Sequence, residues 1–162
     1  MELRFDHVIP RPLEEVEGTL LAADFASRFA ARGGVLARGE VLALEARGRE
    51  LVRTAHFVVG GAVSVGMLGR YGSVGWRETV TWDRERHAGA FTVVPELPAV
   101  LLRRVRCGGT YELVPERDNA TRRVLVARIE VAVPLVGREV EARVAALLRE
   151  LFDDEATFLG EG

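Results

Sequence analysis

Three side chains in this sequence, His7, Glu78 and Tyr111, have the chemistry to contact a ligand from within a β-sheet. An imidazole can donate or accept a proton near neutral pH, a carboxylate can act as a base, and a phenol can offer its hydroxyl. No two histidines have the close spacing of metal ligands, and no serine elbow, paired-carboxylate motif or phosphate loop is present. The sequence therefore supplies polar candidates for a binding site but no recognisable catalytic motif.

His7 lies in "LRFDHVI", which alternates as a half-buried strand. Phe5, His7 and Ile9 share one face, so His7 is predicted to point inward. There it can contact a ligand, or it can be a core histidine that is hydrogen-bonded to a neighbouring element.

Glu78 lies between Trp76 and Trp82 on one face of "VGWRETVTWD". If this face is internal, the carboxylate needs a partner such as His7 or Arg53, because an unpaired buried charge is costly. The alternative is that the face lies outside, with both tryptophans packed on a loop or a partner protein.

Tyr111 shares its strand face with Cys107, the single cysteine of the chain. Tyr111 can offer a hydroxyl to a ligand or be a core tyrosine with its hydroxyl at the rim. Cys107 is predicted to be a small buried hydrophobe, and a lone cysteine excludes an intrachain disulfide.

The composition of the 162 residues, 48% hydrophobic and 28% charged, is that of a globular protein, and we expect one domain over residues 1–162. The net charge of −2 argues against nucleic-acid binding, and no cofactor is predicted. Five arginines could form a basic patch, although a solvated strand face is favoured; these are Arg103, Arg104, Arg106, Arg122 and Arg123.

The first residues lack the basic and then apolar pattern of a signal peptide, and no run of 18 apolar residues occurs. We therefore expect a cytoplasmic protein without an integral membrane segment, as a monomer or a homodimer.

Short helices are predicted after the first strand, within residues 12–24 and 25–32, because apolar residues recur there at helical spacing. Closely spaced strands then favour antiparallel pairing; they are predicted at 35–46, 50–59, 74–83, 88–95, 104–115 and 122–133. The glycine-rich segment 60–75 is interpreted as a lid-like connection, flexible or partly helical, or as a plain loop.

A long final helix is predicted over residues 138–159. Its apolar stripe comprises Val140, Val144, Leu147, Leu148, Leu151, Phe152 and Leu159. In the preceding corner, "VPLVG", Pro134 is expected to end the last strand and Gly137 to permit the reversal of the chain.

The order of these elements resembles the START-like (SRPBCC, helix-grip) superfamily. Three segments are similar to an uncharacterised bacterial branch of it, a domain of unknown function: "FDHVIPRPLEEV", "RETVTWD" and "VPLVGREVEARVAALLRELFDDEATFL". The resemblance implies an α+β fold in which a curved, seven-stranded antiparallel sheet wraps around the C-terminal helix and encloses a cavity.

We therefore predict binding of an apolar or amphipathic small molecule, with lipids among the candidates, between sheet and helix. The expected lining is Phe5, His7, Trp76, Glu78, Trp82 and Tyr111 from the sheet and Val144, Leu148 and Leu151 from the helix. One alternative is a polyketide cyclase/dehydratase-like enzyme with His7, Glu78 or Tyr111 as acid or base. Another is a protein-interaction module with a filled core and an exposed apolar patch.

Overall fold

A seven-stranded antiparallel sheet with the order β1-β7-β6-β5-β4-β3-β2 forms the body of the protein. The computed structural model describes residues 1–60 and 74–162. The strands are β1 (Glu2–Ile9), β2 (Leu36–Arg47), β3 (Glu50–Val59), β4 (Gly75–Asp83), β5 (Ala88–Pro95), β6 (Val105–Glu116) and β7 (Ala120–Val131). Successive strands from β2 to β7 pair with each other, and β1 pairs with β7 as an edge strand of the sheet.

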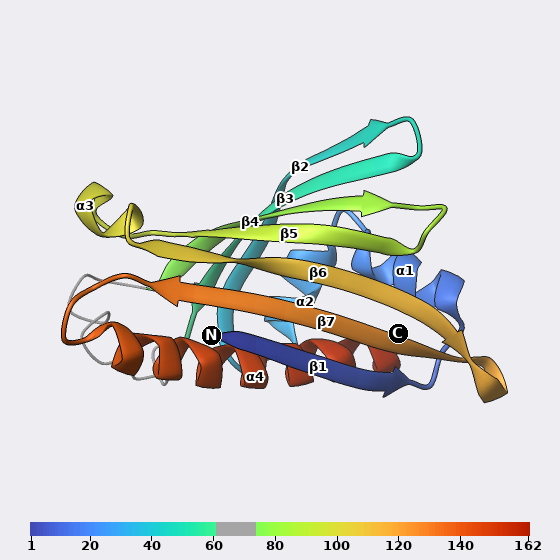
Figure 1. Cartoon of the computed structure of the whole chain (residues 1–162). Coiled ribbons are helices and arrows are strands. Elements are labelled where there is room, and N and C mark those ends of the chain that lie inside the picture. Colours follow the sequence, from blue (N-terminus) through green and yellow to red (C-terminus); the bar gives the residue numbers. More distant parts are fainter. Residues whose placement is uncertain (61–73) are drawn as a thin grey trace.

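Helices accompany this sheet, and Figure 1 shows that the long helix α4 runs along β1 and β7. They are α1 (Leu13–Leu20), α2 (Phe25–Ala31), α3 (Ala99–Leu102) and α4 (Gly137–Glu161), with a short 3-10 turn, η2 (Arg117–Asn119). The α2 helix packs on β2, and α1 contacts α4 and β6. This α+β, helix-grip architecture is the predicted fold class.

The strand faces follow the alternation read from the sequence, because residues two apart project to the same side of a sheet. In β3, Leu51, Arg53, Ala55, Phe57 and Val59 are buried, whereas the residues between them are partly exposed. The predicted bounds of the strands and of α4 agree with the structure to within two residues. The four-residue helix α3 was not predicted, since it is too short for a helical period to be recognised.

The glycine-rich segment predicted as a lid-like connection lies, apart from its ends, outside the described residues. Its last residue, Gly75, begins β4.

The corner between β7 and α4 differs from the prediction. The left-handed backbone conformation is that of Leu135, with φ of 70°, and not that of Gly137. Gly137 begins α4, and a Cβ there would lie well under 3.0 Å from the carbonyl oxygen of Val131. The glycine is therefore needed for close approach of strand and helix. The Glu141 carboxylate strengthens this junction by accepting a hydrogen bond of 3.0 Å from the Val131 N–H.

Two arginines hold the other end of α4, where backbone carbonyls lack helical partners. Arg11 donates to the Leu159 carbonyl at 2.9 Å, and Arg32 pairs with Glu161 at 2.8 Å. Among the described residues, no helix combines the length and apolar character needed to cross a lipid bilayer.

Candidate functional site

An apolar cavity of about 110 Å³, here called the main cavity, lies between the sheet and α4. The sheet side comes from β4 to β7 and the segment after β5, and the helix side from the middle of α4. The lining residues are Val74, Gly75, Trp76, Glu78, Val93, Pro95, Glu96, Leu97, Val105, Cys107, Ile129, Val131, Val140, Val144, Leu147, Leu148, Leu151 and Phe152. An apolar cavity of roughly 150 Å³ can hold benzene, so the main cavity is somewhat smaller and has room for at most one small ring or a short alkyl segment.

Two carboxylates are the charged groups of this lining within residues 1–60 and 74–162. The side chain of Glu96 is 53% exposed and lies 2.7 Å from Nε2 of His56, so it belongs to the rim. The side chain of Glu78 is only 16% exposed. Among the charged groups that line the main cavity, Glu78 is therefore the one that is well buried.

Glu78 is paired with Arg53, whose Nη2 donates to Oε1 at 2.9 Å. Arg53 is itself buried, and its Nη1 donates a hydrogen bond to the Leu20 carbonyl at the end of α1. Its guanidinium carbon lies over the Phe25 ring, 4.6 Å from the ring centre. The ion pair with Glu78 selects Arg53 rather than His7 from the two predicted partners. The buried positions of Trp76 and Trp82 show that the face carrying Glu78 is internal.

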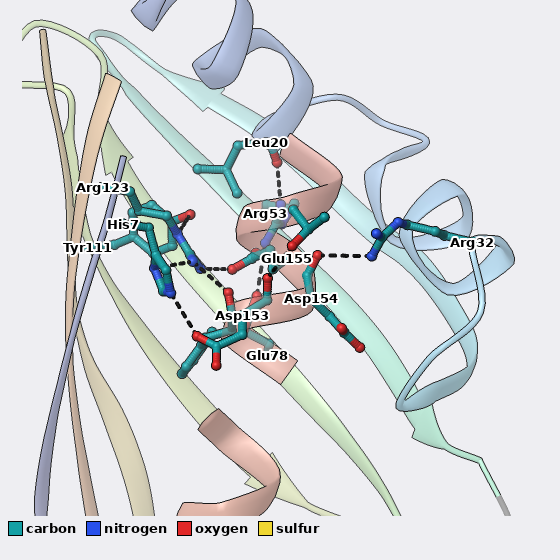
Figure 2. A network of polar contacts seen from close by, with 12 residues as sticks. His7, Leu20, Arg32, Arg53, Glu78, Tyr111, Arg123, Asp153, Asp154 and Glu155 are labelled. Atoms are coloured by element: carbon teal, nitrogen blue, oxygen red, sulfur yellow. Dashed lines mark hydrogen bonds and ion pairs between the residues drawn. The ribbon is translucent and has the colours of Figure 1, made fainter. Parts of the chain in front are cut away.

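A second buried arginine, Arg123 on β7, joins the sheet to α4 (Figure 2). Its guanidinium donates to the Tyr111 hydroxyl, to the Glu155 carboxylate and, at 2.9 Å, to the Phe152 carbonyl. Both predictions for Arg123, a basic patch and the favoured solvated strand face, are therefore wrong, because its side chain is buried. Its neighbour Arg122 is exposed.

His7 faces Arg123 directly across the β1–β7 pair. Its Nδ1 lies 3.3 Å from Nη1 of Arg123, and its Nε2 lies 2.8 Å from Oδ1 of Asp153 on α4 (Figure 2). Because a guanidinium can only donate, Nδ1 must accept, and Nε2 carries the proton directed at Asp153. Both ring nitrogens of His7 are thus engaged, Nδ1 by Arg123 on β7 and Nε2 by Asp153 on α4.

Two smaller cavities of about 20 Å³ each adjoin the same interior. The first, called the polar side cavity, is bordered by Arg53, Glu78, Tyr111 and Glu155 together with apolar residues. The second is bordered mainly by aromatic rings. A cavity of about 10–15 Å³ is large enough for one water molecule. Glu78 and Phe152 each border both of these cavities and the main cavity, so these two residues lie between the three cavities.

The predicted lining residues fall into three groups. Those that line the main cavity are Trp76, Glu78, Val144, Leu148 and Leu151. Trp82 and Tyr111 border the polar side cavity, and the indole N–H of Trp82 donates to Glu17 at 2.7 Å. Phe5 and His7 border none of these three cavities, and Phe5 instead packs edge-on against Phe152, with ring centres 5.0 Å apart.

The sequence analysis missed the internal roles of Arg123 and Glu155, although both left a signal. Arg123 is in phase with the buried residues Thr121 and Leu125 of its strand. Glu155 occupies the gap that the predicted apolar stripe of the final helix leaves after Phe152. Arg123 and Glu155 carry opposite charges on the inner faces of their strand and helix. Because neither charge could be buried alone, this pattern predicts that the two side chains pair.

Burial sets the proton affinities of two interior groups. It raises the pKa of the Tyr111 hydroxyl, and the nearby Arg123 guanidinium partly opposes that shift. Burial, with a smaller contribution from the Glu78 charge, raises the pKa of Cys107 from 9.0 to about 11. Cys107 is thus an unreactive thiol near neutral pH.

Among the described residues, no group of three or more His, Cys, Asp or Glu side chains could hold a metal ion.

A curved antiparallel sheet that closes over an apolar cavity with its C-terminal helix defines a protein of the helix-grip class. The chain belongs to the family described as "Protein of unknown function (DUF2505)", which matches residues 4–161. No curated protein matches this chain in sequence.

Solved structures similar to this fold cover almost the whole chain. Protein TTHA0849 from Thermus thermophilus is 23% identical, with a TM-score of 0.69, over 99% of this chain and 95% of its own. The Zhui aromatase/cyclase from Streptomyces sp. R1128 is 17% identical, with a TM-score of 0.71, over 99% and 92%. Norcoclaurine synthase from Thalictrum flavum is 11% identical, with a TM-score of 0.67, over 100% and 87%. At these identities the similarity concerns the fold.

Proposed function

We propose that this protein is a START-like domain that binds a small apolar or amphipathic molecule in the main cavity without transforming it. The observation that carries the proposal is the main cavity itself, an apolar space with one well-buried charged group, Glu78, in its described lining. Apolar pockets with a few placed polar groups are the usual sites for small molecules.

A non-catalytic role is favoured because the predicted acid–base groups are not assembled around the main cavity. His7 is held by Asp153 and Arg123, and the Tyr111 hydroxyl accepts from Arg123. Glu78 alone reaches the main cavity, and it is paired with Arg53. Two of the similar folds carry enzyme names, an aromatase/cyclase and a synthase, so a cyclase-like enzyme remains the alternative that an activity assay has to test.

A filled-core interaction module is the less favoured alternative, because a space of about 110 Å³ lies under α4. Densely packed interiors leave few voids larger than a water molecule. A space of this size therefore supports occupancy by a ligand.

The proposal is tested with a pair of matched variants. Val144 on α4 lines the main cavity, so Val144→Phe should fill it and abolish binding. Val8 is 64% exposed, so Val8→Phe makes the same substitution away from the main cavity and should leave binding unchanged. Toluene binding by the unaltered protein and by both variants is measured by titration followed with ¹H–¹⁵N NMR. Native mass spectrometry of the freshly purified proteins shows whether a ligand from the cells is bound. Failure of the unaltered protein to bind toluene or to carry any ligand from cells would refute the proposal.

A further inference from the structure

We infer that the ligand carries a neutral hydroxyl group on an apolar body, as an alcohol or phenol does, and that this hydroxyl donates to the Glu78 carboxylate. Carboxylate and phosphate ligands are excluded from the main cavity. This inference rests on the proposed function, since it specifies the chemical class of the molecule bound there.

The lining offers almost nothing that could stabilise an anion. Within the described part of the chain, its charged side chains are the carboxylates Glu78 and Glu96, and it includes no Arg, His, Ser, Thr or Tyr side chain. The indole N–H of Trp76 is its one nitrogen-bound side-chain donor there. An anionic ligand would thus lose its hydration in a lining whose described residues include no positively charged side chain to replace it, which is strongly unfavourable.

The nearby guanidinium groups do not change this balance. Arg53 already pairs with Glu78, and Arg123 already pairs with Glu155. Because each buried positive charge already has its own carboxylate, a carboxylate on the ligand would leave one buried negative charge in excess. For the same reason a buried ammonium group would leave one positive charge in excess, because Arg53 already neutralises Glu78.

Glu78 has capacity for a further donor. Its Oε1 accepts from Arg53, whereas its Oε2 takes part in no hydrogen bond within residues 1–60 and 74–162. A carboxylate has about four acceptor sites, so a neutral O–H can be accommodated without disturbing the pair with Arg53. A hydroxyl oxygen can also accept a hydrogen bond, which suits the Trp76 indole in the same lining.

The test uses four toluenes with different para substituents, which match one small ring: 4-methylphenol, 4-methylanisole, 4-methylbenzylamine and 4-methylbenzoate. At pH 7 the phenol is neutral, the amine is positive and the benzoate is negative. We expect 4-methylphenol to bind roughly tenfold or more tightly than 4-methylanisole, which has lost the donor. The amine and the benzoate should bind more weakly still. Dissociation constants come from ¹H–¹⁵N NMR titration of the unaltered protein.

Glu78→Gln probes the acceptor directly, with Glu130→Gln on the exposed face of β7 as the matched control. In Glu78→Gln, the preference for 4-methylphenol over 4-methylanisole should fall to about threefold or less. The affinity for 4-methylbenzoate should rise relative to that for 4-methylphenol, because a negative charge has been removed. Glu130→Gln should leave the whole series unchanged. Thermal melting establishes that each variant is folded. If Glu78→Gln does not fold, the affinities of the unaltered protein for the four compounds decide the inference.

Failure of the inference can be told apart from failure of the proposed function. If 4-methylanisole or 4-methylbenzoate binds as tightly as 4-methylphenol, the hydroxyl inference is wrong and small-molecule binding stands. If the folded protein binds none of the four compounds, both are wrong.

Discussion

Arg123 on β7 and Glu155 on α4 form an ion pair that is sealed between the sheet and the helix. The Arg123 side chain is 0% exposed and that of Glu155 is 10% exposed. The same guanidinium also bonds the Phe152 carbonyl, so it fixes both the position and the rotation of α4 along the sheet. This contact helps to determine which residues of α4 face the main cavity.

Removing one partner of that pair should be strongly destabilising. Arg123→Met leaves the Glu155 carboxylate buried without its partner, and we expect a loss of about 3–5 kcal/mol in the free energy of unfolding. Urea denaturation followed by circular dichroism measures it. The control Arg122→Met breaks the exposed pair with Asp6 and should cost far less stability than Arg123→Met, because an exposed ion pair is screened by solvent.

The double variant Arg123→Met/Glu155→Leu separates charge from packing. It removes both charges, so it should recover a large part of the stability lost in Arg123→Met. A double variant no more stable than the single one would show that the hydrogen bonds of Arg123 to Tyr111 and Phe152, and not the ion pair, hold the helix.

Glu17 on α1 should stabilise the protein through Trp82. The indole N–H of Trp82, a fully buried residue, donates to Glu17 Oε1 at 2.7 Å, and His87 Nδ1 lies 2.9 Å from the same oxygen. Glu17→Ala leaves the buried N–H without an acceptor, at a cost of about 1–3 kcal/mol. Glu14→Ala, at an exposed position of the same helix, should cost less than about 1 kcal/mol. Equal losses in the two variants, measured by urea denaturation, would contradict this role.

Two glycine-to-alanine substitutions should act in opposite directions. Gly137→Ala forces a Cβ against the Val131 carbonyl and should destabilise the protein by roughly 1–3 kcal/mol through overpacking. Gly18 lies inside α1, and nothing lies within 4 Å of the place that a Cβ would take there, so Gly18→Ala should stabilise by about 0.5–1 kcal/mol. Melting temperatures of the two variants test this pair. A Gly137→Ala protein as stable as the parent would show that the corner can relax.

Cys107 should report on the main cavity through its reaction with iodoacetamide. Burial raises its pKa to about 11, and the thiolate is the reactive form. The rate should therefore rise about tenfold per pH unit from pH 7 to 10 without levelling off, whereas in urea it should level off near pH 9. A bound ligand should slow the reaction further, because Cys107 lines the main cavity. A plateau near pH 9 in the folded protein would show that the thiol is solvated.

Local patterns in the sequence were enough to predict the elements and the direction in which their side chains point. Alternation placed Trp76, Glu78 and Trp82 on one face, and the helical period placed Val144, Leu148 and Leu151 on another; in the structure these residues line the main cavity or border the polar side cavity. Such periods are local properties of a strand or helix, and so they can be read without knowledge of the fold.

Which polar side chains meet, and where space remains, depended on the tertiary structure. Arg53 reaches Glu78 because β3 and β4 pair in a register that sets Arg53 diagonally across from it, and Arg123 reaches Glu155 because α4 crosses the inner face of β7. Those distances depend on strand register and helix placement, which no local pattern encodes. The main cavity likewise depends on the fit of many side-chain volumes at once, which is why inward apolar faces alone predicted a cavity and a filled core equally well.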